Sequence, residues 1–157
     1  KIIKIFTGKE MFDAVKKEMG KKFDIVIMAA AVSDYTPVNP SKNKIKSNKE
    51  QIKISLKKTP KIIDQIKKIQ KNVFLVGYKA EIDISKKELI KVARIKMNES
   101  SADMIVANDI GSKRYKKNPE NNEILIIDSH QVISSGWTKK EKIAKLVRKE
   151  IEKRLKT

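Results

Sequence analysis

Residues 24–31 read DIVIMAAA, and this stretch decides the fold class. It is a continuous apolar run and not an alternation of apolar and polar residues, which is typical of a strand buried on both faces of a sheet. Shorter apolar runs follow at 73–76 and 103–107, and segments with helical spacing of apolar residues lie between these runs. The alternation predicts an α/β domain with a mostly parallel sheet and flanking helices.

Working outward from this stretch gives a full set of expected elements. Strands are expected at 2–6, 24–31, 51–57, 73–76 and 103–107, with an antiparallel edge hairpin at 123–128 and 131–134. Helices are expected at 11–19, 59–70, 86–98 and 138–154. Residues 32–50 contain prolines, asparagines and lysines, so we expect a long irregular segment there.

The composition excludes several function classes. The chain has 157 residues, a formal net charge of +18, no cysteine and one histidine. Disulfides, thiolate zinc sites, cysteine nucleophiles and multi-histidine metal sites are therefore excluded. No apolar run approaches the roughly 20 residues of a membrane-spanning helix, and the start of the chain does not resemble a secretory signal.

The positive charge allows two interpretations. It reflects either well-solvated lysines or a polyanionic partner such as nucleic acid, a nucleotide or a phosphorylated metabolite. Only four of the 37 cations are arginine and aromatic residues make up 5%, which argues against a nucleic-acid reader.

The carboxyl ends of the predicted strands are the expected ligand site, because parallel α/β sheets bind ligands there. Polar residues follow the apolar runs at 30–34, 77–81 and 108–109. The five glycines are scattered and form neither a dinucleotide-binding nor a triphosphate-binding loop. A phosphate site would then need lysines and a helix N-terminus, such as the start predicted at Thr59 and Pro60.

Each candidate residue also has a structural interpretation. Asp34 could accept hydrogen bonds from a base or ribose, hold Mg²⁺, or cap its own turn. Lys44 and Lys46 could fold over an anion or stay solvated, and Tyr78 could stack on a base or pack at the rim of the core. Asn108 and Asp109 carry the same ambiguity as Asp34.

Six short blocks in order resemble one enzyme family. They are MAAAVSDY (28–35), KIK (44–46), TPKII (59–63), VGYKAE (76–81), DMIVAND (103–109) and ENNEI (120–124). Together they are similar to phosphopantothenoylcysteine synthetase, the phosphopantothenate–cysteine ligase of coenzyme A biosynthesis.

The resemblance implies a Rossmann-like fold and a cytoplasmic, CTP-dependent ligase. CTP would activate 4′-phosphopantothenate as an acyl-cytidylate, with Mg²⁺ accompanying the nucleotide, and cysteine would then attack to form the amide. The resemblance also implies a homodimer and, in many prokaryotes, fusion to a flavin-dependent decarboxylase. Residues 1–157 would form a single nucleotide-binding ligase domain, with 32–58 as a flap and dimerisation segment. The alternative from the charge alone is a basic nucleotide- or RNA-binding module without catalysis.

The same resemblance implies the site residues. Lys44 matches a catalytic lysine that acts on the triphosphate. The other implied nucleotide contacts are Met28, Ala29, Ala30, Asp34, Thr59, Pro60, Lys61, Ile62, Tyr78 and Lys96.

Three departures from the family pattern stand out. Lys79 occupies a position where a small residue is usual, and Ser100 stands where a second lysine is expected. The family's N-terminal part, with its phosphate loop, has no counterpart in these 157 residues, so we expect this chain alone to be weak or inactive as a ligase.

Overall fold

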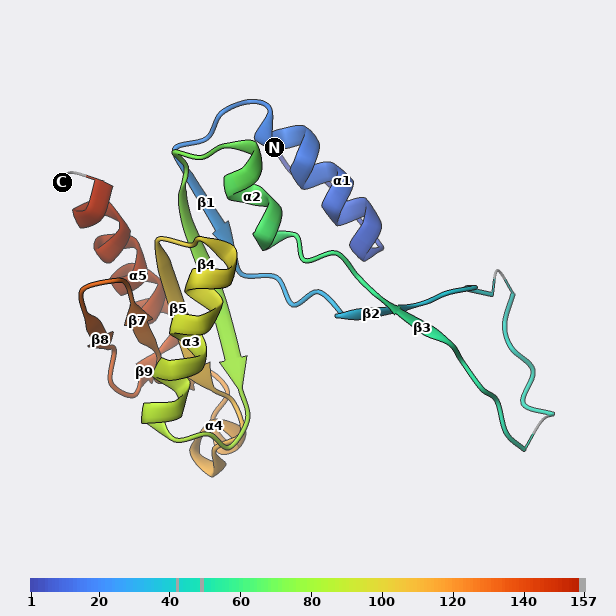
Figure 1. Cartoon of the computed structure of the whole chain (residues 1–157). Coiled ribbons are helices and arrows are strands. Elements are labelled where there is room, and N and C mark those ends of the chain that lie inside the picture. Colours follow the sequence, from blue (N-terminus) through green and yellow to red (C-terminus); the bar gives the residue numbers. More distant parts are fainter. Residues whose placement is uncertain (42, 49, 156–157) are drawn as a thin grey trace.

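A five-stranded sheet forms the centre of the computed structural model, which describes residues 1–41, 43–48 and 50–155 (Figure 1). Its strands, in spatial order, are β1 (Ile25–Met28), β4 (Phe74–Glu81), β5 (Met104–Asp109), β7 (Leu125–Ile127) and β8 (Val132–Ser134). β1, β4 and β5 run parallel, and β7 and β8 add an antiparallel hairpin at the edge. The predicted α/β class with an edge hairpin is confirmed.

Helices cover both faces of this sheet. α1 (Gly8–Met19), α2 (Ile63–Ile69) and α3 (Lys86–Ser100) pack on one face, and α5 (Lys140–Leu155) packs on the other. Successive strand residues serve opposite faces, so Ile105 belongs to the first core and its neighbour Val106 to the second. Both kinds of position must be apolar, which is why the strand sequences are continuous apolar runs.

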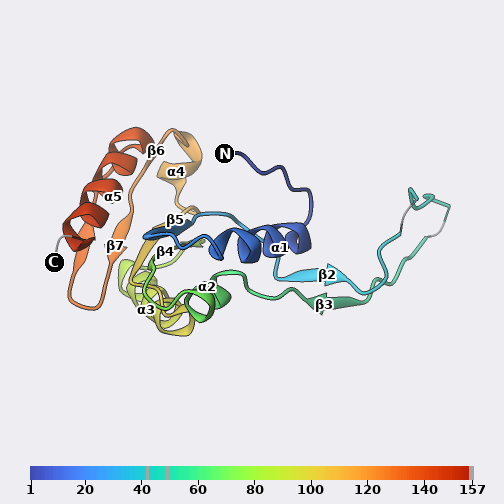
Figure 2. The same cartoon turned by 90° about the horizontal axis from the view of Figure 1, so that it is seen from above.

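A two-stranded arm extends away from the sheet (Figures 1 and 2). It is formed by the antiparallel strands β2 (Tyr35–Pro37) and β3 (Leu56–Lys58). The arm exposes large apolar side chains, including Tyr35, Ile52, Ile54 and Leu56. An isolated two-stranded ribbon is at best marginally stable in water, so these side chains need a cover. The assignment of 32–58 as a flap and dimerisation segment stays a prediction.

Three small elements were not expected from the sequence. They are α4 (Lys113–Lys117), β6 (Asn121–Asn122) and β9 (Thr138–Lys139), the last two pairing in a separate ladder. The guanidinium of Arg114 lies 4.4 Å from the centroid of the Trp137 ring, which holds α4 close to the start of α5.

Several predicted boundaries were wrong. No strand forms at 2–6, where Ile2 and Phe6 are almost fully exposed, because no strand of the described residues lies beside it to supply ladder hydrogen bonds. The strand predicted at 51–57 forms only from Leu56 onward, as part of β3. In contrast, β4 and β5 continue past the predicted ends to Glu81 and Asp109.

Candidate functional site

β1 ends opposite the middle of β4, which leaves a step at the carboxyl edge of the sheet. Met28 pairs with Gly77, whereas β4 continues to Glu81 without a neighbour on that side. The predicted contact residues Ala29 and Ala30 follow β1 and are exposed. Gly77 is buried, and a Cβ there would lie 2.7 Å from Ile105 Cδ1 and 2.8 Å from Ile63 Cδ1. α2 therefore packs directly on the strand at this position.

The base of the arm brings two predicted site residues together. The amide of Thr59 donates a hydrogen bond to the carbonyl of Asp34 (2.9 Å), which joins the end of β3 to the segment after β1. The sequence predicts Thr59 as the N-cap of α2, and this prediction is wrong. The helix begins at Ile63, and the residue at its N-cap position, Ile62, is buried in the core and makes no side-chain cap. Pro60 and Lys61 are exposed in the intervening loop.

A cavity of about 940 Å³ lies between the base of the arm and the first turn of α1. Thr7, Gly8 and Lys9 line one side, and Lys57 to Pro60 line another. The Thr7 hydroxyl accepts a hydrogen bond from the amide of Glu10 (3.1 Å) and caps the helix. The helix N-terminus gives this side of the cavity a partial positive charge.

Thr59 also supplies an unusual polar atom to this cavity. Its Oγ1 is buried and has no hydrogen-bond partner among the described residues. A buried hydroxyl without a partner costs about 1–3 kcal/mol, so a polar group that enters the cavity and bonds to it would recover that free energy.

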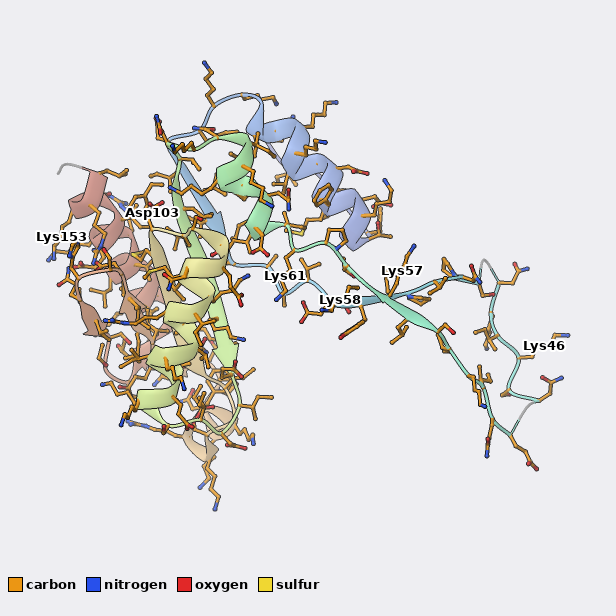
Figure 3. The ribbon with its side chains drawn as sticks, viewed as in Figure 1. Lys46, Lys57, Lys58, Lys61, Asp103 and Lys153 are labelled. Atoms are coloured by element: carbon orange, nitrogen blue, oxygen red, sulfur yellow. The ribbon has the colours of Figure 1, made fainter. Side chains whose placement is uncertain are left out.

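Both cationic and apolar side chains line the cavity. Lys57 and Lys58 line the cavity and take part in no ion pair within the part of the chain that the structure describes. Figure 3 shows both lysines on the inner part of the arm and Lys61 at its base. Phe12 and Val32 contribute apolar surface. The arrangement suits an anion that carries an apolar chain.

Two of the predicted lysines are elsewhere. Lys46 lies at the far end of the arm in Figure 3, and Lys44, two residues earlier, is exposed, so the structure does not bring Lys44 to the cavity. Lys96 connects two helices instead: its Nζ lies 2.9 Å from Asp64 Oδ1, and its side chain is largely buried. Its ammonium is therefore already engaged by a carboxylate.

The part of β4 that extends beyond the end of β1 carries a tyrosine and an ion pair. Tyr78 is 40% exposed, and partial burial raises the pKa of its hydroxyl. Lys79 Nζ lies 2.7 Å from Glu81 Oε1. This pair accounts for the lysine that departs from the family pattern, because its charge is balanced within its own strand.

A carboxylate that the sequence left ambiguous has a clear structural role. Oδ1 of Asp109 accepts hydrogen bonds from the amides of Asp83 (2.9 Å) and Gly111 (2.8 Å), so it holds together the loops that follow β4 and β5. A Cβ on Gly111 would lie 2.3 Å from the Asp83 nitrogen, so these loops are in close contact. No sequence signal pointed to this bridge, because the Asp83 amide lies in a separate loop.

No group of three or more histidine, aspartate or glutamate side chains that could hold a metal ion occurs within the described ranges. No described helix is both long and apolar enough to cross a membrane.

Comparison with known proteins identifies the family. The model of the DNA/pantothenate metabolism flavoprotein C-terminal domain matches residues 1–155. The chain belongs to this family.

The curated relatives are longer than this chain, and several of them are named for coenzyme A biosynthesis. The coenzyme A biosynthesis bifunctional protein CoaBC of Thermococcus kodakarensis is 39% identical over 154 residues, covering 98% of this chain and 37% of the relative. CoaBC of Methanocaldococcus jannaschii is 37% identical over 146 residues, covering 93% of this chain and 35% of the relative. A cysteine/cysteine sulfinic acid decarboxylase from an unknown prokaryote is 34% identical, with 94% of this chain and 41% of the relative covered. The chain spans about two-fifths of such relatives.

Solved structures show the same fold. The DNA/pantothenate metabolism flavoprotein of Streptococcus pneumoniae aligns with a TM-score of 0.83 at 27% identity, covering 98% of this chain and 73% of that one. The C-terminal domain of a CoaBC aligns with a TM-score of 0.74 at 25% identity, covering 98% and 65%.

These findings correct the family and the activity inferred from the sequence. The assignment to phosphopantothenoylcysteine synthetase is replaced by the flavoprotein C-terminal-domain family. The CTP-dependent ligase activity, with CTP and Mg²⁺, is withdrawn with it, because the matched names describe a flavoprotein and bifunctional coenzyme A biosynthesis proteins and, in one case, a decarboxylase. The alternative of a basic nucleotide- or RNA-binding module without catalysis is not supported either, since the curated relatives are metabolic proteins.

The family name implies a flavin, and the carboxyl edge of the sheet is where such a ligand is expected. Ile63 and Ile105 already fill the space against Gly77. A planar ring therefore has no room against Gly77, and the residues at this position do not fit a flavin.

Proposed function

We propose that this chain serves coenzyme A biosynthesis by binding a phosphorylated pantothenate derivative in the cavity at the base of the arm. The observation that carries the proposal is the buried, unpartnered Thr59 hydroxyl in a cavity with cationic sides and apolar surface. The relatives named for coenzyme A biosynthesis support the metabolic context.

The chemistry of 4′-phosphopantothenate matches the two kinds of surface. Its phosphate is a dianion, and Lys57, Lys58 and the N-terminus of α1 offer positive charge on two sides of the cavity. Its geminal dimethyl group is apolar and suits the surface formed by Phe12 and Val32. The Thr59 hydroxyl can bond to an amide or phosphate oxygen of the same ligand.

The curated relatives are longer than this chain, which supports a larger protein around this binding step. We expect the complete polypeptide to combine this cavity with a flavin-dependent decarboxylase region, and the cysteine adduct of phosphopantothenate to be a second ligand of the cavity. We also expect two copies to pair through the exposed apolar side chains of the arm.

Calorimetric titration of the 157-residue chain tests the proposal. We expect saturable binding of 4′-phosphopantothenate near one per chain and at least tenfold weaker binding of pantothenate, because a charge-assisted hydrogen bond contributes about 1.5–3 kcal/mol. Lys58→Gln and Thr59→Val should each weaken binding. Lys91→Gln, an exposed lysine of α3, is the matched control and should change nothing.

Three outcomes would contradict the proposal. They are equal affinity for the two ligands, equal effects of Lys58→Gln and Lys91→Gln, and no binding at all. Flavin mononucleotide is titrated in parallel, and saturable binding that competes with phosphopantothenate would assign the cavity to the flavin instead.

A further inference from the structure

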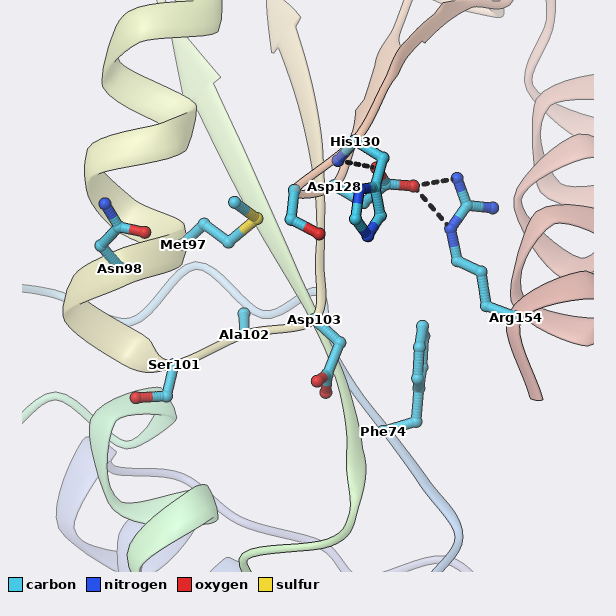
Figure 4. A pocket seen from close by; sticks show the side chains of 10 residues that line it. Phe74, Met97, Asn98, Ser101, Ala102, Asp103, Asp128, His130 and Arg154 are labelled. Atoms are coloured by element: carbon cyan, nitrogen blue, oxygen red, sulfur yellow. Dashed lines mark hydrogen bonds and ion pairs between the residues drawn. The ribbon is translucent and has the colours of Figure 1, made fainter. Parts of the chain in front are cut away.

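A second cavity lies at the opposite edge of the sheet (Figure 4). It has a volume of about 560 Å³ and is bordered by the amino ends of β4 and β5, the end of α3, the turn between β7 and β8, and α5. Its lining includes Phe74, Met97 and His130 and three charged residues, Asp103, Asp128 and Arg154. None of them lines the cavity at the base of the arm.

The charged residues of this second cavity are neutralised by protein partners. Asp103 Oδ2 lies 2.7 Å from Lys67 Nζ and accepts a hydrogen bond from the amide of Leu75 (2.6 Å). Asp128 Oδ2 accepts hydrogen bonds from Nε (2.8 Å) and Nη2 of Arg154. The remaining guanidinium nitrogen of Arg154, Nη1, bonds to Glu150 (2.8 Å).

This pairing excludes strongly charged ligands. A phosphate or carboxylate would have to take Arg154 from two buried carboxylates, and a cation would have to take Asp103 or Asp128 from their donors. Breaking a buried ion pair is strongly unfavourable. The cavity therefore suits a neutral molecule.

The uncharged part of the cavity lining consists of an aromatic ring, a thioether and side chains that can form hydrogen bonds. Figure 4 shows the Phe74 ring and the Met97 thioether on either side of the cavity, with the His130 ring directed into it from the turn between β7 and β8. The His130 imidazole makes no hydrogen bond to any described residue, and its side chain is exposed. Asn98, Ser101 and Ser129 add neutral donors and acceptors.

We propose that this cavity is a second ligand site, which takes the base of a neutral nucleoside. A nucleobase is flat and polarisable, so it packs well on the Phe74 ring and the Met97 sulfur. It also carries donors and acceptors on its edges for His130 and the amide of Asn98. Because the site lies away from the carboxyl edge of the parallel strands, its occupant would act on the chain without touching the ligand proposed above.

Adenosine is the probe, and ¹H–¹⁵N correlation spectra of the whole chain are the readout. We expect saturable shifts confined to the cavity lining and its neighbours, at residues 73–75, 97–103, 128–131 and 154, with adenosine monophosphate binding no more tightly than adenosine. His130→Ala and Phe74→Leu should each weaken binding several-fold. Gln131→Ala, an exposed neighbour outside the cavity lining, is the matched control.

The results that would overturn the proposal are specific to this site. They are the absence of shifts with millimolar adenosine, shifts that survive both variants, and tighter binding of the monophosphate, which would show that the site holds an anion. His130 is exposed, so loss of folding does not explain a change in His130→Ala. Perturbation of residues 31–38 and 57–60 instead would point to the cavity at the base of the arm.

Discussion

Removing the guanidinium of Arg154 should strongly destabilise the chain. Arg154 sits between two buried acids: Asp128 Oδ2 accepts hydrogen bonds from its Nε and Nη2, and Glu150 accepts one from its Nη1. The side chains of Asp128 and Glu150 are only 8% and 4% exposed. Arg154→Ala would leave Asp128 with its backbone donors alone and Glu150 with Lys153.

The expected cost follows from the burial of these acids. Breaking a buried ion pair by removing one partner costs about 3–5 kcal/mol, because the remaining charge stays desolvated. For a chain of 157 residues, each kcal/mol shifts the melting temperature by about 2–4 °C. Arg154→Ala should therefore lower the melting temperature by about 6–20 °C.

Thermal unfolding followed by circular dichroism, with urea unfolding in parallel, measures this loss. The control is Arg148→Ala in the same helix, whose exposed guanidinium pairs with exposed Glu152 and should contribute little. A melting temperature for Arg154→Ala within 2 °C or so of that for Arg148→Ala would refute the reasoning, because the two acids would then be stable without their cation.

Three further predictions concern the core, the pH response and the arm. Gly77→Ala should cost about 1–3 kcal/mol in urea unfolding by overpacking the strand, whereas Gly20→Ala, with a helical backbone and room for the methyl group, should not destabilise the chain. Burial alone would raise the pKa of Asp128, but hydrogen bonds from Arg154 and two amides outweigh burial and lower it; hydrogen bonds, first from Lys153, lower the pKa of Glu150. Both acids therefore stabilise the fold above their unfolded pKa values of about 4. The free energy of unfolding, measured by urea titration, should fall as the pH drops through the lower pKa values of the folded state. A flat profile between pH 5 and about 2 would contradict this prediction. Ile54→Asp should shift the chain from dimer to monomer in sedimentation equilibrium, and a wild-type chain that is monomeric at high concentration would argue against pairing through the arm.

The buried strands were predictable because both of their faces are covered by apolar side chains. Helices cover both faces of the sheet, so residues on both sides of β5 must be apolar and the run is visible without knowledge of the partners. The segment 2–6 has an equally strand-like sequence. A strand also needs a neighbour to bond to, and the sequence of 2–6 carries no information about that neighbour.

The predicted helix start at Thr59 was wrong for a similar reason. A hydroxyl followed by proline is a local cap signal, yet the amide of Thr59 bonds to the distant carbonyl of Asp34 and the chain turns into α2 only at Ile63. The strand-end rule did place residues 30–34 at the carboxyl edge of the sheet. It could not predict that the N-terminus of α1 and Lys58 would join them, because the arm that carries Lys58 folds back through long-range pairing.

The shared oxygen of Asp109 has a consequence for protein engineering. The loop after β4 and the loop after β5 both depend on the same acceptor, and Gly111 has room for no side chain against Asp83. A chimaera that takes one of these loops from a relative would separate a donor from its acceptor or force a side chain into backbone. Grafts between members of this family should therefore exchange the two loops as a matched set.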